Sequence, residues 1–195
     1  IGKGADIFAT AERAFLICDE NEYLSFKYDA DGLGAGVRGD ARIINDRRYK
    51  AAQPQIEITA FRGSEAPFAP ESEDVKGRKN QDFFANRKAQ GWWALRARFQ
   101  KTHRWIAEGL ACNPDEIIGL PSDLPNLMKL VSELSQPTYA INAVGKIVVD
   151  KKPDGTKSPN LADAVMIQFA RVEQSIHVDA AILTQIMQSG RGRRW

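Results

Sequence analysis

The sequence has little cysteine and no long apolar run, and both absences narrow the kinds of protein it can be. Its two cysteines, Cys18 and Cys112, are too few for a disulfide framework and too far apart for a zinc knuckle. We expect both to be reduced packing residues. No run approaches the roughly 20 apolar residues of a membrane helix, and the N-terminus lacks the pattern of a secretory signal. A cytosolic protein without membrane contact is the simple interpretation.

Nucleotide-binding fingerprints are also missing. The glycine-rich stretch at residues 32–36 lacks the third glycine at the spacing of a dinucleotide-binding fingerprint. No Gly-Lys-Ser/Thr of a phosphate-binding loop follows it. We therefore predict no ATPase in this chain. The only histidines, His103 and His177, have no partner at a metal-ligand spacing, so we interpret them as structural or surface residues.

The composition is that of an ordinary folded domain, because 43% of the residues are apolar and 27% are charged. A net charge of only +2 gives no global basic field that would by itself indicate nucleic acid. Basic residues do gather locally, which fits solvated faces and DNA contacts equally well. Since the sequence begins with Ile1 rather than methionine, we expect an excised fragment.

The first half of the chain alternates helical and strand patterns. Apolar residues at three- and four-residue steps predict a helix over 6–20, and alternation predicts strands over 24–28 and 56–61. A short helix to about residue 45 separates the strands, and an exposed loop follows at 62–79. Further periodicity predicts one long helix over 81–108, with Gly91 as a possible bend. Trp92, Trp93 and Trp105 on that helix are expected in the core rather than stacked on bases.

The second half combines helices with a hairpin. A helix is expected over 124–134, followed by strands at 138–141 and 146–150 around the turn 142–145. Ser158 and Pro159 have the chemistry of a helix cap and first residue, so a helix should run through Asp163 to about residue 172. A last helix is expected over 178–188. These elements predict an α/β fold, with a mixed sheet flanked by helices and an added β-hairpin.

Two aspartates are placed where chemistry is possible. Asp29 follows a strand and precedes a glycine-rich turn, and ligands gather at such strand ends in open α/β sheets. Asp163 lies in the first turns of a helix between small residues. Each has an ordinary explanation, turn initiation for Asp29 and helix-dipole stabilisation for Asp163. Together, two carboxylates flanked by small residues could converge on divalent cations, which prefer oxygen ligands.

At these residues the sequence resembles the nuclease domain of tailed-phage terminase large subunits. Residues 29–37, DADGLGAGV, are similar to the second acidic motif of that family, and residues 158–164, SPNLADA, are similar to its third. The segments NRKAQGWW at 86–93 and IGLP at 118–121 resemble its intervening helix and short strand. The similarity is greatest to the headful-packaging terminases of short-tailed phages.

This resemblance implies an RNase H-like nuclease domain over residues 1–175, followed by a C-terminal helix and basic tail over 176–195. It implies a two-metal endonuclease that uses Mg²⁺ or Mn²⁺, with Asp29 and Asp163 as catalytic metal ligands. Asp31, Lys151 and Lys152 are possible auxiliaries, although solvated charge explains the lysines equally well. The family's first aspartate has no counterpart before residue 28, so we expect the first strands and that carboxylate upstream of Ile1.

The resemblance also implies a double-stranded DNA substrate, a portal protein and a small terminase subunit as partners, and the host cytoplasm as the site of action rather than the mature virion. A non-catalytic docking module that binds DNA or the portal is the main alternative. A nuclease of the RuvC or transposase type on the same fold is a third possibility. The docking alternative rests on the basic and aromatic tail, which comprises Arg191, Arg193, Arg194 and Trp195.

Overall fold

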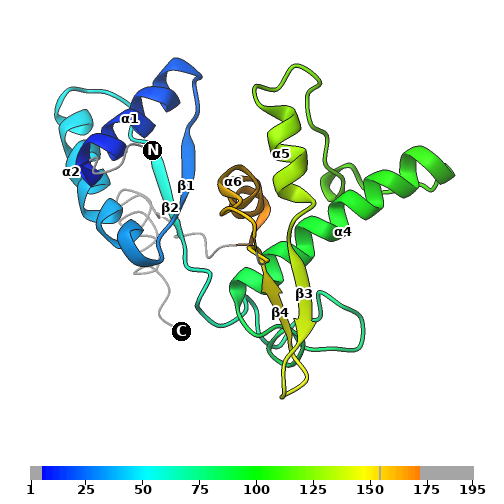
Figure 1. Ribbon diagram of the computed structural model, residues 1–195. Coiled ribbons are helices and arrows are strands. Elements are labelled where there is room, and N and C mark those ends of the chain that lie inside the picture. Colours follow the sequence, from blue (N-terminus) through cyan, green and yellow to red (C-terminus); the bar gives the residue numbers. More distant parts are fainter. Residues whose placement is uncertain (1–5, 154, 172–195) are drawn as a thin grey trace, which may run out of the picture.

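The computed structural model describes residues 6–153 and 155–171, which form helices around two small sheets (Figure 1). The first half contains α1 (Ile7–Glu20), β1 (Ser25–Asp29), the 3₁₀ turn η1 (Gly32–Gly36), α2 (Val37–Lys50) and β2 (Glu57–Phe61). The second half contains α3 (Asn80–Phe83), α4 (Arg87–Glu108), η2 (Pro114–Glu116), α5 (Leu127–Leu134), β3 (Thr138–Ile141), β4 (Ile147–Asp150) and α6 (Asn160–Phe169). The α/β class and the hairpin are confirmed.

The strands form two separate pairs, so the prediction of a single mixed sheet was wrong for the described residues. Strands β1 and β2 run parallel with Asp29 opposite Phe61, whereas β3 and β4 form an antiparallel hairpin. Helix α6 lies between the two pairs (Figure 1). The hairpin does not pair with β1. Its Ile147 instead forms an isolated β-bridge with Phe84.

Helices α1 and α2 pack on the β1–β2 pair and form one apolar core. The Asp6 carboxylate accepts from the Phe8 backbone N–H, which satisfies an amide at the start of α1. Arg48 of α2 makes two hydrogen bonds to the Asp19 carboxylate of α1, at 2.7 and 2.8 Å. Helix α2 continues to Lys50, beyond the predicted end near residue 45. The buried residues of this core are Ala11, Phe15, Cys18, Ala41, Ile44 and Ile56.

The long helix predicted over 81–108 is interrupted at residues 84–86. Phe84 has extended backbone and bridges to Ile147, and Asn86 then caps α4 by accepting from the Ala89 N–H at 2.9 Å. Gly91 lies inside the continuous helix α4. It lets α4 approach α6, because a Cβ there would lie 2.6 Å from Sδ of Met166.

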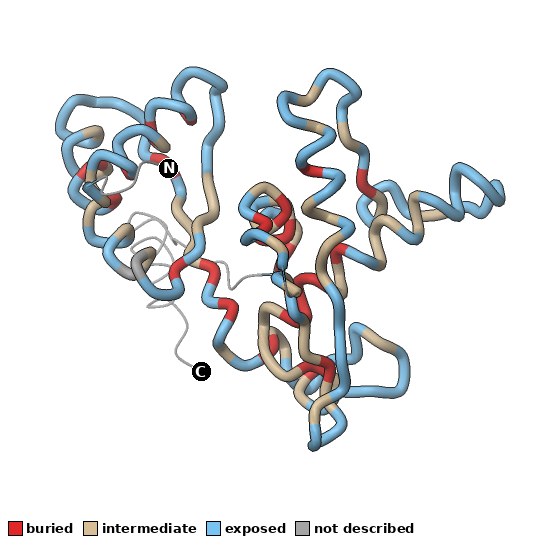
Figure 2. Tube along the Cα trace, viewed as in Figure 1, coloured by how far each residue is buried: buried red, intermediate tan, exposed pale blue. Residues whose placement is uncertain are grey.

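Three further expectations for this region were wrong. Helix α5 begins at Leu127 rather than 124, after Asn126 in a left-handed conformation with φ 62°. Residues 118–121, which resemble the family's short strand, are not a strand. Trp105 is 49% exposed, because the far end of α4 projects from the rest of the fold, whereas Trp92 is buried at 6% (Figures 1 and 2).

Residues 62–79 form the expected loop, and two buried amides hold it. The Asn80 side chain donates to the carbonyls of Phe68 and Ala69, and Gln90 exchanges hydrogen bonds with the backbone of Phe68. Elsewhere in the described residues, Cys18 and Cys112 are free thiols, of which Cys18 is buried. No helix in the described part is long and apolar enough to span a membrane. The predicted helix at 178–188, His177 and the 175/176 boundary lie outside the described residues.

Candidate active site

Asp29 ends β1 in an exposed position, and the glycine-rich turn folds back on it. Its Oδ1 accepts from the Asp31 N–H at 3.0 Å, which leaves Oδ2 available. A Cβ on Gly34 would lie only 1.8 Å from the Asp29 carbonyl oxygen, so the turn can close on the strand end only with glycine there. Close backbone packing against the aspartate thus explains Gly34, whereas Gly32 is explained by its positive φ of 61°.

Asp31 joins the end of β1 to the turn after β2. Its two carboxylate oxygens accept from Ser64, one from the backbone N–H at 3.0 Å and the other from the hydroxyl at 2.9 Å. The same turn is tied to α4, because the Lys88 N–H donates to the Gly63 carbonyl and Arg87 pairs with Glu65. This arrangement favours a structural role for Asp31 beside Asp29.

Asp163 lies on the first turns of α6, with a side chain that is 14% exposed. The Lys151 ammonium, from the segment after β4, donates to its Oδ2. Oδ1 of Asp163 is buried and has no hydrogen-bond partner among the described residues. A buried carboxylate oxygen without a partner is costly, so this atom has unused capacity to accept a ligand. Lys152 is exposed and makes no ion pair within the part of the chain that the structure describes.

Two polar side chains at the end of α5 hold the segment that carries Lys151 and Asp163. Glu133 Oε2 accepts from the backbone N–H groups of Leu161 and Ala162, at 2.6 and 3.1 Å. The α6 N-terminus is therefore capped by a carboxylate from another helix, not by the Ser158 side chain that the sequence suggested. Gln136 follows the same helix, and its amide donates to the carbonyls of residues 151 and 157, both at 2.7 Å.

Strand β1 packs directly against α6, so the elements that carry the two aspartates are in contact. Nζ of Lys27 in β1 donates to the Gln168 and Ala170 carbonyls at the C-terminal end of α6, at 2.8 and 3.1 Å. A lysine at a helix C-terminus suits the helix dipole. Partial burial lowers the pKa of Lys27 below its usual value.

The donor set suits a hard divalent cation. Mg²⁺ in proteins is often held by one or two carboxylates, with water and substrate phosphate completing the shell. Asp29 and Asp163 offer carboxylate oxygens, and the buried Oδ1 of Asp163 lacks any other partner. Within residues 6–153 and 155–171, no three acidic, histidine or cysteine side chains gather into a metal-binding group. Asp29 and Asp163 are therefore the candidate ligands that the sequence motifs indicate, and they are not joined by a third such side chain among the described residues.

Sequence patterns missed Glu133 and Gln136 as residues that build this site. Glu133 follows the buried Leu130 by three residues, so it lies near the inner face of α5, where an acidic residue is unusual even with Lys129 one turn away. That spacing was the available signal. The candidate tail residues Arg191, Arg193, Arg194 and Trp195 lie outside the described residues.

Comparison with solved structures identifies the family. The fold matches the nuclease domain of the large terminase subunit gp2 of bacterial virus Sf6, with a TM-score of 0.74 and 30% sequence identity. The match covers 88% of this chain and 76% of that chain. The chain belongs to the terminase large-subunit nuclease family. No family model and no curated protein matches the sequence.

Two further structures of the Sf6 domain match at the same 30% identity and 88% coverage of this chain. One is a lysine-to-alanine variant with manganese and beta-thujaplicinol, with a TM-score of 0.73 and 76% of its own length covered. Another is the corresponding variant with calcium, with a TM-score of 0.71 and 75% covered. The family resemblance seen in the acidic motifs is confirmed by this terminase nuclease fold.

Proposed function

We propose that this terminase domain is a metal-dependent endonuclease of the RNase H-like type that cuts double-stranded DNA during viral genome packaging. Asp29 and Asp163 are its proposed metal ligands, and Mg²⁺ or Mn²⁺ its proposed ions. Membership of the nuclease family implies the DNA-cutting role. Manganese and calcium accompany the Sf6 domain in the matching structures.

The observation that carries the proposal is the state of the Asp163 carboxylate. One oxygen is paired with Lys151 and the other is buried without a partner in the described residues. A purely structural aspartate at a helix start would use its oxygens on nearby N–H groups, yet here Glu133 already accepts from the first amides of α6. Asp163 is therefore left available for another ligand.

Two bound cations would lower the pKa of a water nucleophile and stabilise the leaving oxygen of the scissile phosphate. The role of the protein residues would be to hold the cations in place. Asp29 and Asp163 supply carboxylate oxygens, and Lys151 fixes one Asp163 oxygen so that the other keeps its direction. We expect little sequence preference, since DNA would be held through its phosphates rather than its base edges.

The test is supercoiled-plasmid cutting in Mn²⁺ by the complete protein and by its Asp163→Ala variant. We expect the substitution to abolish cutting without unfolding the domain, as judged by circular dichroism. Asp123→Ala is the matched control, because Asp123 is an exposed aspartate outside the proposed site, and it should cut at the unsubstituted rate. Retained cutting by Asp163→Ala would overturn the site assignment.

The choice of DNA substrate separates this function from that of related nucleases on the same fold. A packaging nuclease should cut linear and supercoiled duplexes. An enzyme of the RuvC or transposase type should instead favour a four-way junction, so a strong junction preference would contradict the packaging role.

A docking function of the tail is proposed from sequence alone. In this second proposal, residues 191–195 bind the portal protein, the small terminase subunit joins the same assembly, and the complex acts in the host cytoplasm. Deletion of residues 191–195 should weaken portal binding in a pull-down and leave plasmid cutting unchanged. Unchanged binding would remove this role for Arg191, Arg193, Arg194 and Trp195.

A further inference from the structure

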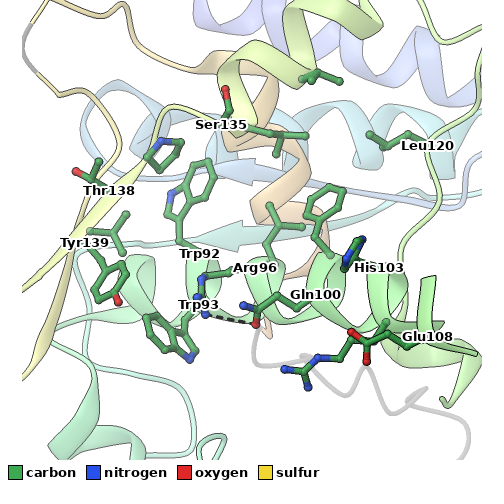
Figure 3. A pocket seen from close by; sticks show the side chains of 17 residues that line it. Trp92, Trp93, Arg96, Gln100, His103, Glu108, Leu120, Ser135, Thr138 and Tyr139 are labelled. Atoms are coloured by element: carbon green, nitrogen blue, oxygen red, sulfur yellow. Dashed lines mark hydrogen bonds between the residues drawn. The ribbon is translucent and has the colours of Figure 1, made fainter. Parts of the chain in front are cut away.

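A groove of about 710 Å³ lies between α4, α5 and β3, lined by none of the proposed site residues (Figure 3). Its apolar lining includes Trp92 and Phe99 of α4, Leu134 of α5, and Tyr139 of β3. Tyr139 is 53% exposed and Val131, also in the lining, is 45% exposed. Aromatic and apolar side chains left open to solvent in a hollow are typical of a binding surface.

The groove is elongated along α4. Its lining begins at Trp92 and reaches Glu108 on the same helix. At a rise of about 1.5 Å per residue, this span is about 24 Å, which equals the length of a helix of about 16 residues. Amphipathic helices are commonly bound in apolar grooves of this form, with side chains at three- and four-residue steps as anchors.

Two arginines of α4, Arg96 and Arg104, line the groove and give this wall positive charge, and Glu108 lies at its end. Neither Arg96 nor Arg104 pairs with a carboxylate among the described residues. Arg96 instead lies over the Trp93 ring at 5.0 Å and contacts Gln100 (Figure 3). Exposed arginines beside aromatic side chains are frequent anchors of protein interfaces, and their charge would attract a negatively charged partner.

The aromatic residues do not form a platform for stacked bases. Phe83 and Tyr139 contact the Trp93 ring at centroid distances of 5.4 and 5.3 Å, nearly perpendicular to it, and Arg96 lies over it as well. Single-stranded nucleic acid needs aromatic faces free for stacking. A symmetric dimer through this groove is also disfavoured, because it would bring the same arginines of both copies together.

We propose that this groove binds an acidic amphipathic helix of a partner protein, with apolar side chains over Phe99 and Leu134 and carboxylates paired with Arg96 and Arg104. The apolar floor supplies affinity, and the two arginines set the charge preference and the orientation of the helix. This interaction is independent of the proposed cutting site.

A pair of synthetic helices tests the proposal against the full chain. Each peptide has about 16 residues with leucines at three- and four-residue steps, flanked by glutamates in one peptide and by lysines in its isomer. Fluorescence anisotropy at low salt should give saturable binding of the glutamate peptide, about tenfold tighter than the lysine isomer. Added salt should reduce this difference.

Charge reversal in the protein provides the decisive comparison. The double substitution Arg96→Glu and Arg104→Glu should reverse the preference between the two peptides. Lys50→Glu, at the end of α2 and outside the groove, should leave the preference unchanged. Both arginines are exposed, so circular dichroism should remain that of the unsubstituted chain.

Four results would overturn the proposal. These are equal affinity for the two peptides, no saturable binding of either, displacement of the glutamate peptide by micromolar oligo-dT, and a concentration-dependent dimer that the double substitution abolishes. The third result would assign the groove to nucleic acid, and the fourth to a second copy of the chain.

Discussion

Lys151 donates a hydrogen bond to Oδ2 of Asp163, and it does so from the segment after β4 while Asp163 lies on α6. The pair thus joins the hairpin to the helix. Because the Lys151 side chain is 27% exposed and that of Asp163 is 14% exposed, water screens their attraction only in part. The Lys151 ammonium is thus the positive charge that stabilises the Asp163 carboxylate.

Removal of the Lys151 charge should therefore lower the stability of the folded state, because the Asp163 carboxylate would stay mostly buried without its partner. We expect Lys151→Met to lower the free energy of unfolding by about 1–3 kcal/mol without metal, because a mostly buried carboxylate loses its partner. Saturating Mn²⁺ should recover part of this loss by binding the folded state. Urea denaturation with and without Mn²⁺ measures both effects.

The neighbouring exposed lysine gives the control for this substitution. Lys152→Met should change the unfolding free energy by no more than about 0.5 kcal/mol, as is usual for surface positions. Equal losses for the two variants would mean that the pairing of Lys151 with Asp163 contributes nothing measurable.

Loss of the Glu133 carboxylate should affect both the stability of the fold and metal binding at the proposed site. Glu133→Ala removes the acceptor of two N–H groups at the start of α6, for an expected loss of about 2 kcal/mol in unfolding free energy. Glu133→Gln keeps an acceptor of the same shape and should lose less than half as much. If Glu133 positions Asp163, isothermal titration should also give weaker Mn²⁺ binding for the alanine variant.

The control for Glu133 is an acid whose pairing is exposed. Glu20 pairs with Arg13 on the surface of α1, so Glu20→Ala should cost at most about 0.5 kcal/mol and leave Mn²⁺ binding unchanged. Stability losses of the same size for Glu20→Ala and Glu133→Ala would refute the capping role.

Elements defined by local chemistry were predictable from the sequence. Helix α1 has its predicted extent, because Asp6 caps it and its apolar residues follow the helical period. The hairpin β3–β4 was predicted because the segment 142–145 supplies a turn with Gly145 at φ 80°. The two acidic motifs likewise led from local residues to the family.

Features that depend on distant contacts were not predictable. The break before α4 results from the bridge between Phe84 and Ile147, which lie far apart in sequence. The cap on α6 comes from Glu133, 28 residues before Leu161, and no local pattern encodes that pairing. Such tertiary contacts override local preferences, and they also determine how Asp163 is held.

The ion pair between Asp19 and Arg48 should give the stability a distinct acid dependence. The Arg48 guanidinium, bonded to both oxygens, lowers the pKa of Asp19 below its usual value. A carboxyl with a lowered folded-state pKa contributes stability above its unfolded value of about 3.9, and this is lost as pH falls through the folded value. Urea midpoints measured downward from pH 6 should therefore fall less steeply below about pH 4 for Asp19→Asn. Parallel profiles for the two proteins would contradict this role.

Alanine substitutions at two glycines of the same region should change stability in opposite directions. One position has no room for a Cβ, whereas at the other the Cβ only improves helix propensity. A Cβ at Gly34 would lie 1.8 Å from the Asp29 carbonyl oxygen, and backbone cannot yield as a flexible side chain can. Gly34→Ala should therefore cost about 2 kcal/mol or more and weaken Mn²⁺ binding by displacing Asp29. At Gly39, in the first turn of α2, no atom lies within 4 Å of a built Cβ, so Gly39→Ala should add about 0.5–1 kcal/mol. Thermal unfolding and Mn²⁺ titration of the two variants measure these effects. If Gly34→Ala were as stable as Gly39→Ala and bound Mn²⁺ normally, the close approach of the glycine turn would not be what positions Asp29.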